Sequence, residues 1–197
     1  MGRRRGGFHR RLVDTRDIRQ RFLIICEGET EKVYFEGFHA PHVVMRVKSG
    51  DSDPLRLVVQ ARDHQRRERD AFDQIWCVFD RDVVPVERFS RALQEAEESA
   101  IHIAYSNPAF ELWFLLHFET CGALTRQDSI QRLGRWLKRP YKKGDFRLYE
   151  ALEARQEEAV DRATRLLANY HFRNPTADNP STTVHLLVQE LRRFSRP

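Results

Sequence analysis

The stretch Phe22-Leu-Ile-Ile-Cys-Glu-Gly-Glu-Thr-Glu31 decides the fold that the sequence predicts. Four apolar residues and a cysteine lead directly into Glu27 and a glycine, and an acidic, helix-favouring segment follows. A short, uninterrupted apolar run beside a glycine is typical of a strand buried on both faces, as in a parallel sheet. Glu27 would then lie at the carboxyl end of this strand, where open α/β sheets bind their ligands. Thr30 or Glu29 is expected to cap a helix that begins near Glu31.

A second apolar run, Gln74-Ile-Trp-Cys-Val-Phe-Asp-Arg-Asp82, also ends in acidic residues. In an extended chain Asp80 and Asp82 point to the same side, about 6.5 Å apart. If the two strands are neighbours, these carboxylates lie close to Glu27. At an effective dielectric constant of about 20, two unit charges about 5 Å apart repel by on the order of 3 kcal/mol. Such a cluster stays protonated, stays hydrated or binds a cation, and hard oxygen ligands suit Mg²⁺ or Mn²⁺. The alternative, which either stretch alone would favour, is that the acids are solvated strand-end residues unrelated to each other.

Helices and strands alternate through the rest of the N-terminal half. This order is typical of βαβ units and predicts a doubly wound parallel sheet of the α/β class, flanked by helices. Asn107 and Pro108 are expected to be the N-cap and first residue of a buried helix that includes Glu111. A buried acid there needs a partner, whether the helix N-terminus, an arginine or the metal site. The patterns predict helices over residues 31–38, 54–70, 86–98 and 110–118, and strands over 42–47 and 101–105.

From Leu124 onward the pattern predicts helices and no strand. Apolar residues at helical spacing indicate helices over 130–137, over 148–170 as one long or two shorter helices, and over a last segment that begins at Asn179 and Pro180. The sequence therefore predicts an α/β domain over residues 22–122 and a helical part over residues 123–197 that packs on it.

The net charge of +5 lies in an N-terminal arm, residues 1–21, which carries eight arginines and two aspartates. An arginine-rich arm that includes Arg3, Arg4 and Arg5 is typical of segments that bind phosphate backbones. An acidic protein partner, or solubility alone, would explain the arm as well.

Two further loops carry candidate cations. Lys48 follows a predicted strand and could neutralise charge on a reacting phosphate, or it could simply face water. Lys142 and Lys143 follow Tyr141, and Lys138 and Arg139 precede it and Pro140. Four cations around an aromatic and a proline suit a loop that contacts a nucleic-acid backbone while the ring stacks on a base. Surface solubility is the alternative for this second loop.

Composition bounds the class of protein. With 197 residues and 41% apolar content, the chain can form one substantial core. No apolar run is long enough for a membrane span, and no signal peptide opens the sequence. Three cysteines, two of them in predicted buried strands, are typical of a reducing cytoplasm, so a cytoplasmic location is expected.

A buried strand that ends in Glu-Gly, followed by one that ends in Asp-x-Asp, resembles the Toprim domain. That domain is shared by topoisomerases, bacterial primases and OLD-type nucleases. The chain is most similar to the RloB-like family of Toprim proteins associated with bacterial defence. The segments that carry the resemblance are Cys26-Glu-Gly-Glu-Thr-Glu31, Phe79-Asp-Arg-Asp82, Asn107-Pro-Ala-Phe-Glu-Leu-Trp113 and Asn179-Pro-Ser-Thr-Thr-Val184.

The resemblance implies a Mg²⁺- or Mn²⁺-dependent nuclease that hydrolyses phosphodiester bonds of DNA or RNA. It implies an effector of phage defence and abortive infection that works with an ABC-type ATPase partner. A catalytically inactive nucleic-acid-binding subunit is the alternative, and a homodimer is left open. The implied roles are metal binding by Glu27, Glu31, Asp80, Asp82 and Glu111, and acid–base catalysis by Glu27.

Overall fold

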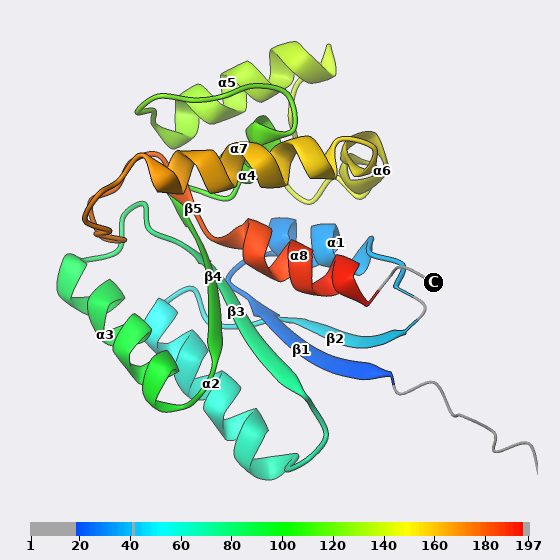
Figure 1. Ribbon diagram of the computed structural model, residues 1–197, viewed down its shortest axis with the longest axis vertical. Helices are drawn as coiled ribbons and strands as arrows, with labels where there is room; N and C mark the ends of the chain where they lie inside the picture. Colours follow the sequence, from blue (N-terminus) through cyan, green and yellow to red (C-terminus); the bar gives the residue numbers. More distant parts are fainter. Residues whose placement is uncertain (1–18, 41, 195–197) are drawn as a thin grey trace, which may run out of the picture.

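A five-stranded sheet forms the centre of the computed structural model, which describes residues 19–40 and 42–194 (Figure 1). The strand order is β2-β1-β3-β4-β5, with the first four strands parallel and β5 antiparallel to β4. The prediction of an α/β fold with a parallel sheet flanked by helices is confirmed. The strands are β1 (Gln20–Cys26), β2 (Val43–Ser49), β3 (Gln74–Asp80), β4 (His102–Asn107) and β5 (Ser181–Thr182).

Helices cover both faces of the sheet. Apolar residues of α2 and α3 pack on one face, and α1, α4 and the C-terminal helices share a second core on the other face (Figure 1). Alternate residues of β1 enter the two cores, with Ile24 in one and Ile25 in the other, which explains its unbroken apolar run. The helices are α1 (Glu29–Glu36), α2 (Pro54–Arg67), α3 (Val86–Glu98), α4 (Glu111–Leu116), α5 (Arg126–Leu137), α6 (Leu148–Glu153), α7 (Gln156–Ala168) and α8 (Val184–Arg193).

The C-terminal part contains a strand that the sequence analysis did not predict. Ser181 and Thr182 pair antiparallel with the end of β4, and the Thr182 hydroxyl lies 3.0 Å from the carbonyl oxygen of Tyr105. The last helix therefore begins at Val184 rather than at Asn179. A strand of two residues is too short to produce a hydrophobic period, so the pattern could not reveal it.

Two predicted helix starts are also wrong. Helix α1 begins at Glu29 with Gly28 at its N-cap and no side-chain cap. Helix α4 begins at Glu111, while Asn107 is the last residue of β4 and its amide donates to the carbonyl oxygen of Asp178 over 2.8 Å. Asn107 thus ties β4 to the C-terminal segment instead of capping a helix.

The N-terminal arm and the domain boundary were also predicted from the sequence, and the structure leaves both predictions open. The arginine-rich arm, including Arg3, Arg4 and Arg5, lies outside the described residues except for its last three positions. The division of the chain at residue 122 stays a prediction. Within the part of the chain that the structure describes, no helix is both long and apolar enough to cross a membrane.

Candidate metal centre

The central strands bring Glu27 and Asp80 side by side. Strand β1 pairs with β3 in parallel register, with Cys26 opposite Val78, so both strands end at the same edge of the sheet. The backbone N–H of Glu27 donates to the carbonyl oxygen of Val78 over 2.8 Å. In return, Oε2 of Glu27 accepts a hydrogen bond of 2.9 Å from the backbone N–H of Asp80.

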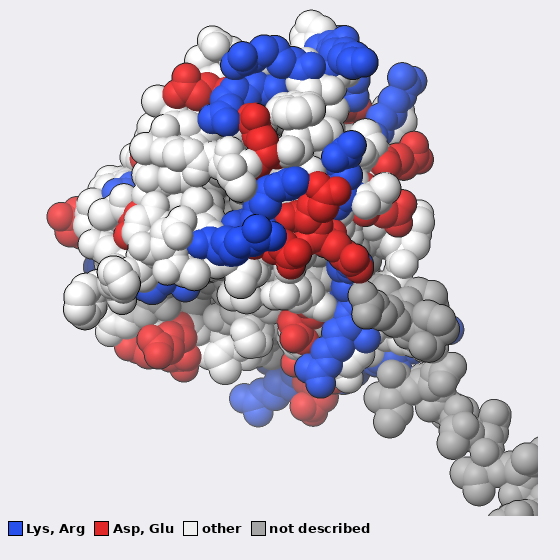
Figure 2. Space-filling model, turned by 45° about the horizontal axis from the view of Figure 1, so that its top comes forward, with Lys and Arg blue, Asp and Glu red and all other residues white. Residues whose placement is uncertain are grey.

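A pocket of 290 Å³ opens at this edge. Its walls come from loops and helices that are far apart in the sequence and that meet where parallel strands end. On the face shown in Figure 2, acidic side chains form a patch beside basic ones. The residues that line the pocket are Glu27, Gly28, Glu29, Thr30, Glu31, Ser52, Asp80, Glu111, Arg126, Lys143 and Gly144.

Glu31 projects into the pocket from the first turns of α1. Its carboxyl is buried, and its Oε2 has no hydrogen-bond partner. Burial, together with the charges of Glu27 and Glu111, raises the pKa of Glu31 to about 7. Gly28 makes room for this carboxyl, because a Cβ at that position would lie 2.8 Å from Oε2 of Glu31. A side chain at position 28 would therefore displace this carboxyl from its present position.

Asp80 and Glu111 form the deeper wall of the pocket. They are 5% and 2% exposed, and Oδ1 of Asp80 has no hydrogen-bond partner. Burial raises the pKa of Asp80 well above its usual value, and the nearby charge of Glu31 adds to the effect. Burial also raises the pKa of Glu27, although the hydrogen bond from Asp80 and the charge of Arg126 oppose that shift. The carboxyl groups that line the pocket thus outnumber the basic side chains that could neutralise their charge.

Arg126 is the functional candidate that sequence reasoning missed. As the first residue of α5, it extends its guanidinium among the acids, where it contacts Asp80, lies 3.1 Å from Asp82 and lies 3.7 Å from Glu111. The only local signal was the capping box at the start of α5, in which Thr125 and Asp128 bond to each other's backbone N–H groups. That motif fixes where the helix begins, but it does not show which residue reaches the sheet edge.

Asp82 lies outside the pocket walls. Strand β3 ends at Asp80, so the extended geometry that would align the two aspartates does not continue to Asp82. Its side chain, which is 28% exposed, pairs with Arg126, and its charge contributes to the raised pKa of Glu27. Asp82 is therefore an outer member of the acidic group.

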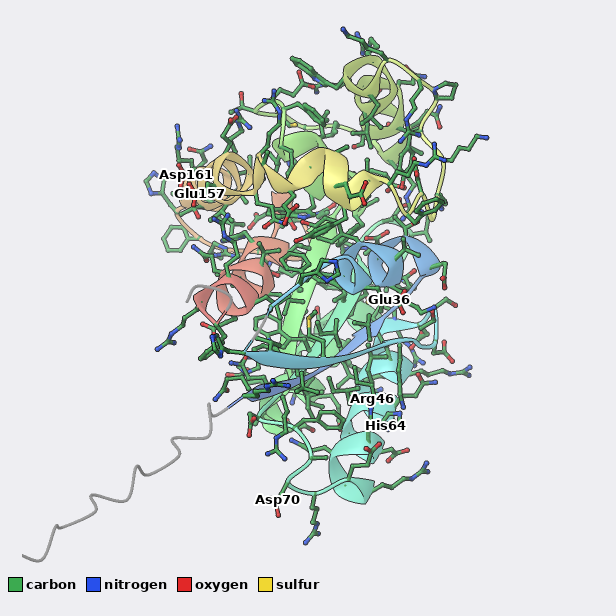
Figure 3. The ribbon with its side chains drawn as sticks, turned by 90° about the vertical axis from the view of Figure 1, so that its right-hand side faces the viewer. Glu36, Arg46, His64, Asp70, Glu157 and Asp161 are labelled. Atoms are coloured by element: carbon green, nitrogen blue, oxygen red, sulfur yellow. The ribbon has the colours of Figure 1, made fainter. Side chains whose placement is uncertain are left out.

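The loop cations divide between two places. Lys143 lines the acid pocket, and its charge opposes the rise in the pKa of Glu27 that burial causes. Lys48 instead lies in a separate hollow against α2, with its Nζ 3.3 Å from Nε2 of His64. Figure 3 shows His64 beside Arg46 on that side of β2. The geometry gives a catalytic role of Lys48 no support, and that role stays a prediction.

Tyr141 is partly buried and makes contacts through both its hydroxyl and its ring, and its role in stacking on a base stays a prediction. Its hydroxyl donates to Oε1 of Glu111 over 3.3 Å, and its ring packs against Phe114. Burial and the charge of Glu111 raise the pKa of Tyr141. Tyr141 thus holds one of the carboxyl groups that line the acid pocket, that of Glu111.

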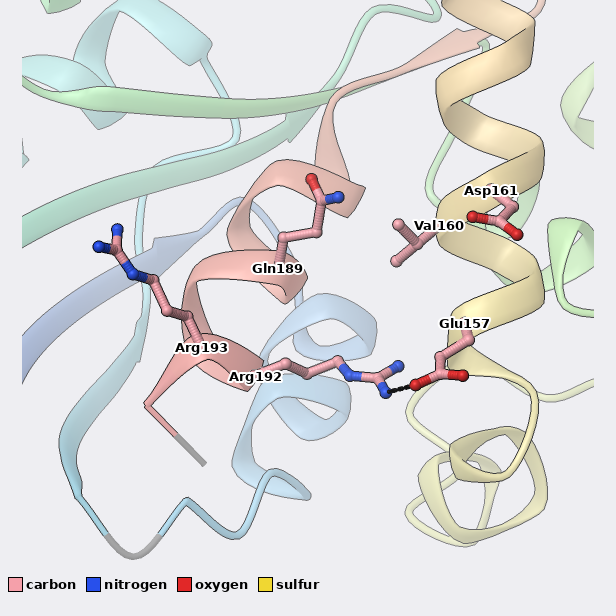
Figure 4. A pocket seen from close by; sticks show the side chains of 6 residues that line it. All are labelled: Glu157, Val160, Asp161, Gln189, Arg192 and Arg193. Carbon is pink, nitrogen blue, oxygen red and sulfur yellow. Dashed lines mark hydrogen bonds and ion pairs between the residues drawn. The ribbon is translucent and has the colours of Figure 1, made fainter. Parts of the chain in front are cut away.

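A different hollow, of 480 Å³, lies between α7 and α8 (Figure 4). It lies away from the strand ends, and the Arg192 side chain crosses it to Glu157 at 2.5 Å. None of the residues that line it has a buried carboxyl oxygen without a hydrogen-bond partner, whereas two residues of the acid pocket, Glu31 and Asp80, do.

The donor set of the acid pocket fits a divalent cation in its chemistry. Carboxylates are the ligands that Mg²⁺ and Mn²⁺ prefer, and two buried carboxyl oxygens, on Glu31 and Asp80, have no hydrogen-bond partner. In their present positions, however, no three Asp, Glu, His or Cys side chains among the described residues form a group that could hold a metal ion. The acids surround the guanidinium of Arg126 instead.

A family model described as RloB-like protein matches residues 22–191. The chain belongs to the RloB-like family. The match spans every strand except the first two residues of β1, and it includes all of the acids described above. Neither a curated protein nor a solved structure matches the chain.

Proposed function

We propose that this RloB-like protein is a Toprim-type nuclease that uses Mg²⁺ or Mn²⁺ to hydrolyse phosphodiester bonds of DNA or RNA. The observation that carries the proposal is the meeting of Glu27, Glu31, Asp80 and Glu111 in one pocket at the carboxyl edge of the sheet. They come from the turn after β1, from α1, from β3 and from α4. Crowded, buried acids with raised pKa values are typical of functional sites.

Glu27, Glu31, Asp80 and Glu111 would hold the cation, with Asp82 as an outer ligand. A divalent cation bound there would lower the pKa of a water molecule and offset charge on the phosphoryl oxygens. Glu27 would accept the proton of the attacking water, because its pKa is raised and its Oε1 is not engaged by the hydrogen bond from Asp80.

Arg126 would exchange partners during binding. Its guanidinium now neutralises Asp80 and Asp82, which is the electrostatic work that a bound cation would perform. Once released, a planar guanidinium with several donors suits a substrate phosphate better than a carboxylate pocket that is already neutralised. The same side chain would thereby stabilise the metal-free protein and bind the substrate.

The test is cleavage of single- and double-stranded DNA and RNA by purified protein with Mg²⁺, with Mn²⁺ and with EDTA. Metal-dependent cleavage that Glu27→Gln abolishes, in a variant with unchanged circular dichroism, is the expected result. Cleavage by a folded Glu27→Gln protein at the wild-type rate would contradict the proposal.

A role in phage defence with an ABC-type ATPase follows from the family resemblance alone. If the partner controls the nuclease, the isolated chain has low activity and an affinity-tagged chain recovers an ATPase from its native cells. Recovery of no ATPase would count against the partnership and would leave the nuclease proposal intact.

A catalytically inactive nucleic-acid-binding subunit is the second candidate, because the loop over residues 138–147 carries five basic residues and a single acid. This candidate predicts nucleic-acid binding that is insensitive to EDTA, together with no cleavage under any metal condition. Metal-dependent cleavage lost in Asp80→Ala would exclude it.

A further inference from the structure

The basic loop, residues 138–147, forms a second hollow directly beside the acid pocket. The hollow has a volume of 540 Å³ and is lined by residues 139, 140 and 142–147 of the loop. Lys143 and Gly144 line both this hollow and the acid pocket, so the two spaces adjoin. A ligand that filled the hollow would continue past Lys143 to the acids.

Phe146 gives this hollow an aromatic surface. Its side chain is 71% exposed, and the guanidinium of Arg147 lies 5.4 Å from the centre of its ring. A single exposed apolar residue is ordinary on a protein surface. Here the ring lies among four exposed cations, which is the combination of stacking platform and positive charge that binds unpaired nucleotides. Those cations are Arg139, Lys142, Lys143 and Arg147.

The loop is held in place by contacts with its surroundings. The backbone N–H of Gly144 donates to the Thr30 hydroxyl over 3.3 Å, which ties the loop to α1. Within the loop, Arg139 and Asp145 form an ion pair of 2.5 Å. Gly144 has a φ of +68°, a left-handed conformation that favours glycine and turns the chain between Lys143 and Asp145. The hollow is thus preformed, with its only acid already engaged by Arg139.

We infer that the basic loop is a subsite for an unpaired nucleotide, in which a base stacks on Phe146 and the adjacent phosphates contact Lys142 and Lys143. A base inside a duplex is covered on both faces by its neighbours, so only a single strand, a loop or a flipped nucleotide can offer a face to the ring. This inference deepens the proposed function by assigning single-stranded or looped nucleic acid as its substrate class. It rests on the proposed function only for the cleavage of the bound strand, because binding is tested without cleavage.

The test measures binding without cleavage. Fluorescence anisotropy of a short labelled single-stranded oligonucleotide, as DNA and as RNA, is titrated in EDTA with wild type, Phe146→Ala and Phe172→Ala. Phe172 is a matched control, because it is 94% exposed but is not among the residues that line either hollow. Thermal unfolding midpoints that match wild type show that the exposed substitutions leave the fold intact.

The expected result is that Phe146→Ala raises the Kd for the single strand by about 5- to 150-fold, the effect of losing one base–aromatic stack. Phe172→Ala should leave that Kd unchanged, and neither variant should change the Kd for a duplex of the same sequence. Lys142→Ala should weaken binding to both forms and reduce the slope of log K against log salt by about 1.

Equal single-strand affinities of Phe146→Ala and Phe172→Ala would overturn the inference, as would a wild type that does not bind the single strand. Because the assay contains no metal, either result leaves the nuclease proposal to its own cleavage test. Conversely, Phe146-dependent binding in a protein that never cleaves would support the subsite while refuting the nuclease.

Discussion

The two ends of strand β3 carry aspartates in opposite electrostatic states. Asp73, directly before the strand, receives hydrogen bonds from the backbone and guanidinium of Arg21 at 2.8 and 2.9 Å, which hold its pKa below the usual value. Asp80, the last residue of the strand, is buried among other acids, and its pKa is raised. Both carboxyl oxygens of Asp73 accept hydrogen bonds from Arg21, whereas Oδ1 of Asp80 has no hydrogen-bond partner.

This contrast separates a structural acid from a functional one. An acid whose partners come from its own chain contributes to folding, and an exposed pair such as Arg21–Asp73 contributes only about 0–1 kcal/mol. A buried group of acids with too few cations destabilises the fold, so a ligand from outside the chain is the natural means of compensation.

The largest expected effect is on catalysis. Asp80→Asn should lower metal-dependent cleavage by at least about 100-fold, because it removes a ligand charge from the pocket. Asp73→Asn is the matched control at the other end of the strand and should cleave at the wild-type rate. Single-turnover cleavage rates of the two variants, measured side by side, test this difference. Equal losses of cleavage rate in Asp80→Asn and Asp73→Asn would contradict the distinction between the two ends of the strand.

The next effect is a pH dependence of stability that belongs to Glu31. The pKa of Glu31 is about 7 in the folded protein against an ordinary value of 4.5, so the folded state binds this proton more tightly. Stability is therefore lost as pH rises from about 4.5 to about 7. In EDTA, the free energy of unfolding of Glu31→Gln should equal that of wild type at about pH 4.5. Above pH 7 it should be higher than that of wild type by up to about 3 kcal/mol.

Denaturant unfolding across this pH range measures the difference between the two proteins. The difference is informative because the buried histidines His117 and His185, whose pKa falls to about 4, give both proteins the same opposing slope. Glu36→Gln, an exposed position on the same helix, is the control and should run parallel to wild type. Mn²⁺ should reduce the advantage of Glu31→Gln, and a parallel course of Glu31→Gln and wild type would contradict the assignment.

A smaller effect is expected from Arg126. Arg126→Ala leaves Asp80 and Asp82 without their cation and should lower the free energy of unfolding in EDTA by about 1–2 kcal/mol. Added Mn²⁺ should then stabilise this variant more than wild type, because the guanidinium no longer competes. Arg132 lies on the same helix as Arg126, and Arg132→Ala, which removes its 2.7 Å pair with Glu119, should show no such gain with Mn²⁺. Equal Mn²⁺-induced shifts in both variants would show that Arg126 and the metal do not exchange.

The smallest effect should come from Lys48. Because its Nζ faces His64 on the α2 side of the sheet, Lys48→Ala should change the cleavage rate by less than about threefold, the scale of a surface charge. Lys143→Ala, which removes a cation from the pocket itself, should reduce cleavage more. The reverse order would restore the catalytic role that the sequence predicted for Lys48.

The sheet and the meeting of the strand-end acids could be predicted from the sequence, because buried parallel strands give unbroken apolar runs and place their carboxyl ends at one edge. Glu27 and Asp80 follow directly from that rule. Arg126 could not be predicted, since its position depends on how α5 packs beyond the sheet. Phe146 was missed for a similar reason, because the exposure of one aromatic in a basic loop depends on tertiary contacts, here those that hold the partly buried Tyr141 against Phe114 and Glu111.

The central claim is tested most directly by a crystal grown with Mn²⁺ and measured for anomalous scattering. We predict a peak in the pocket between Glu27, Glu31, Asp80 and Glu111, with the Arg126 guanidinium moved away from Asp80. A crystal with Mn²⁺ bound elsewhere, or with none in the pocket and Arg126 still bridging Asp80 and Asp82, would contradict it.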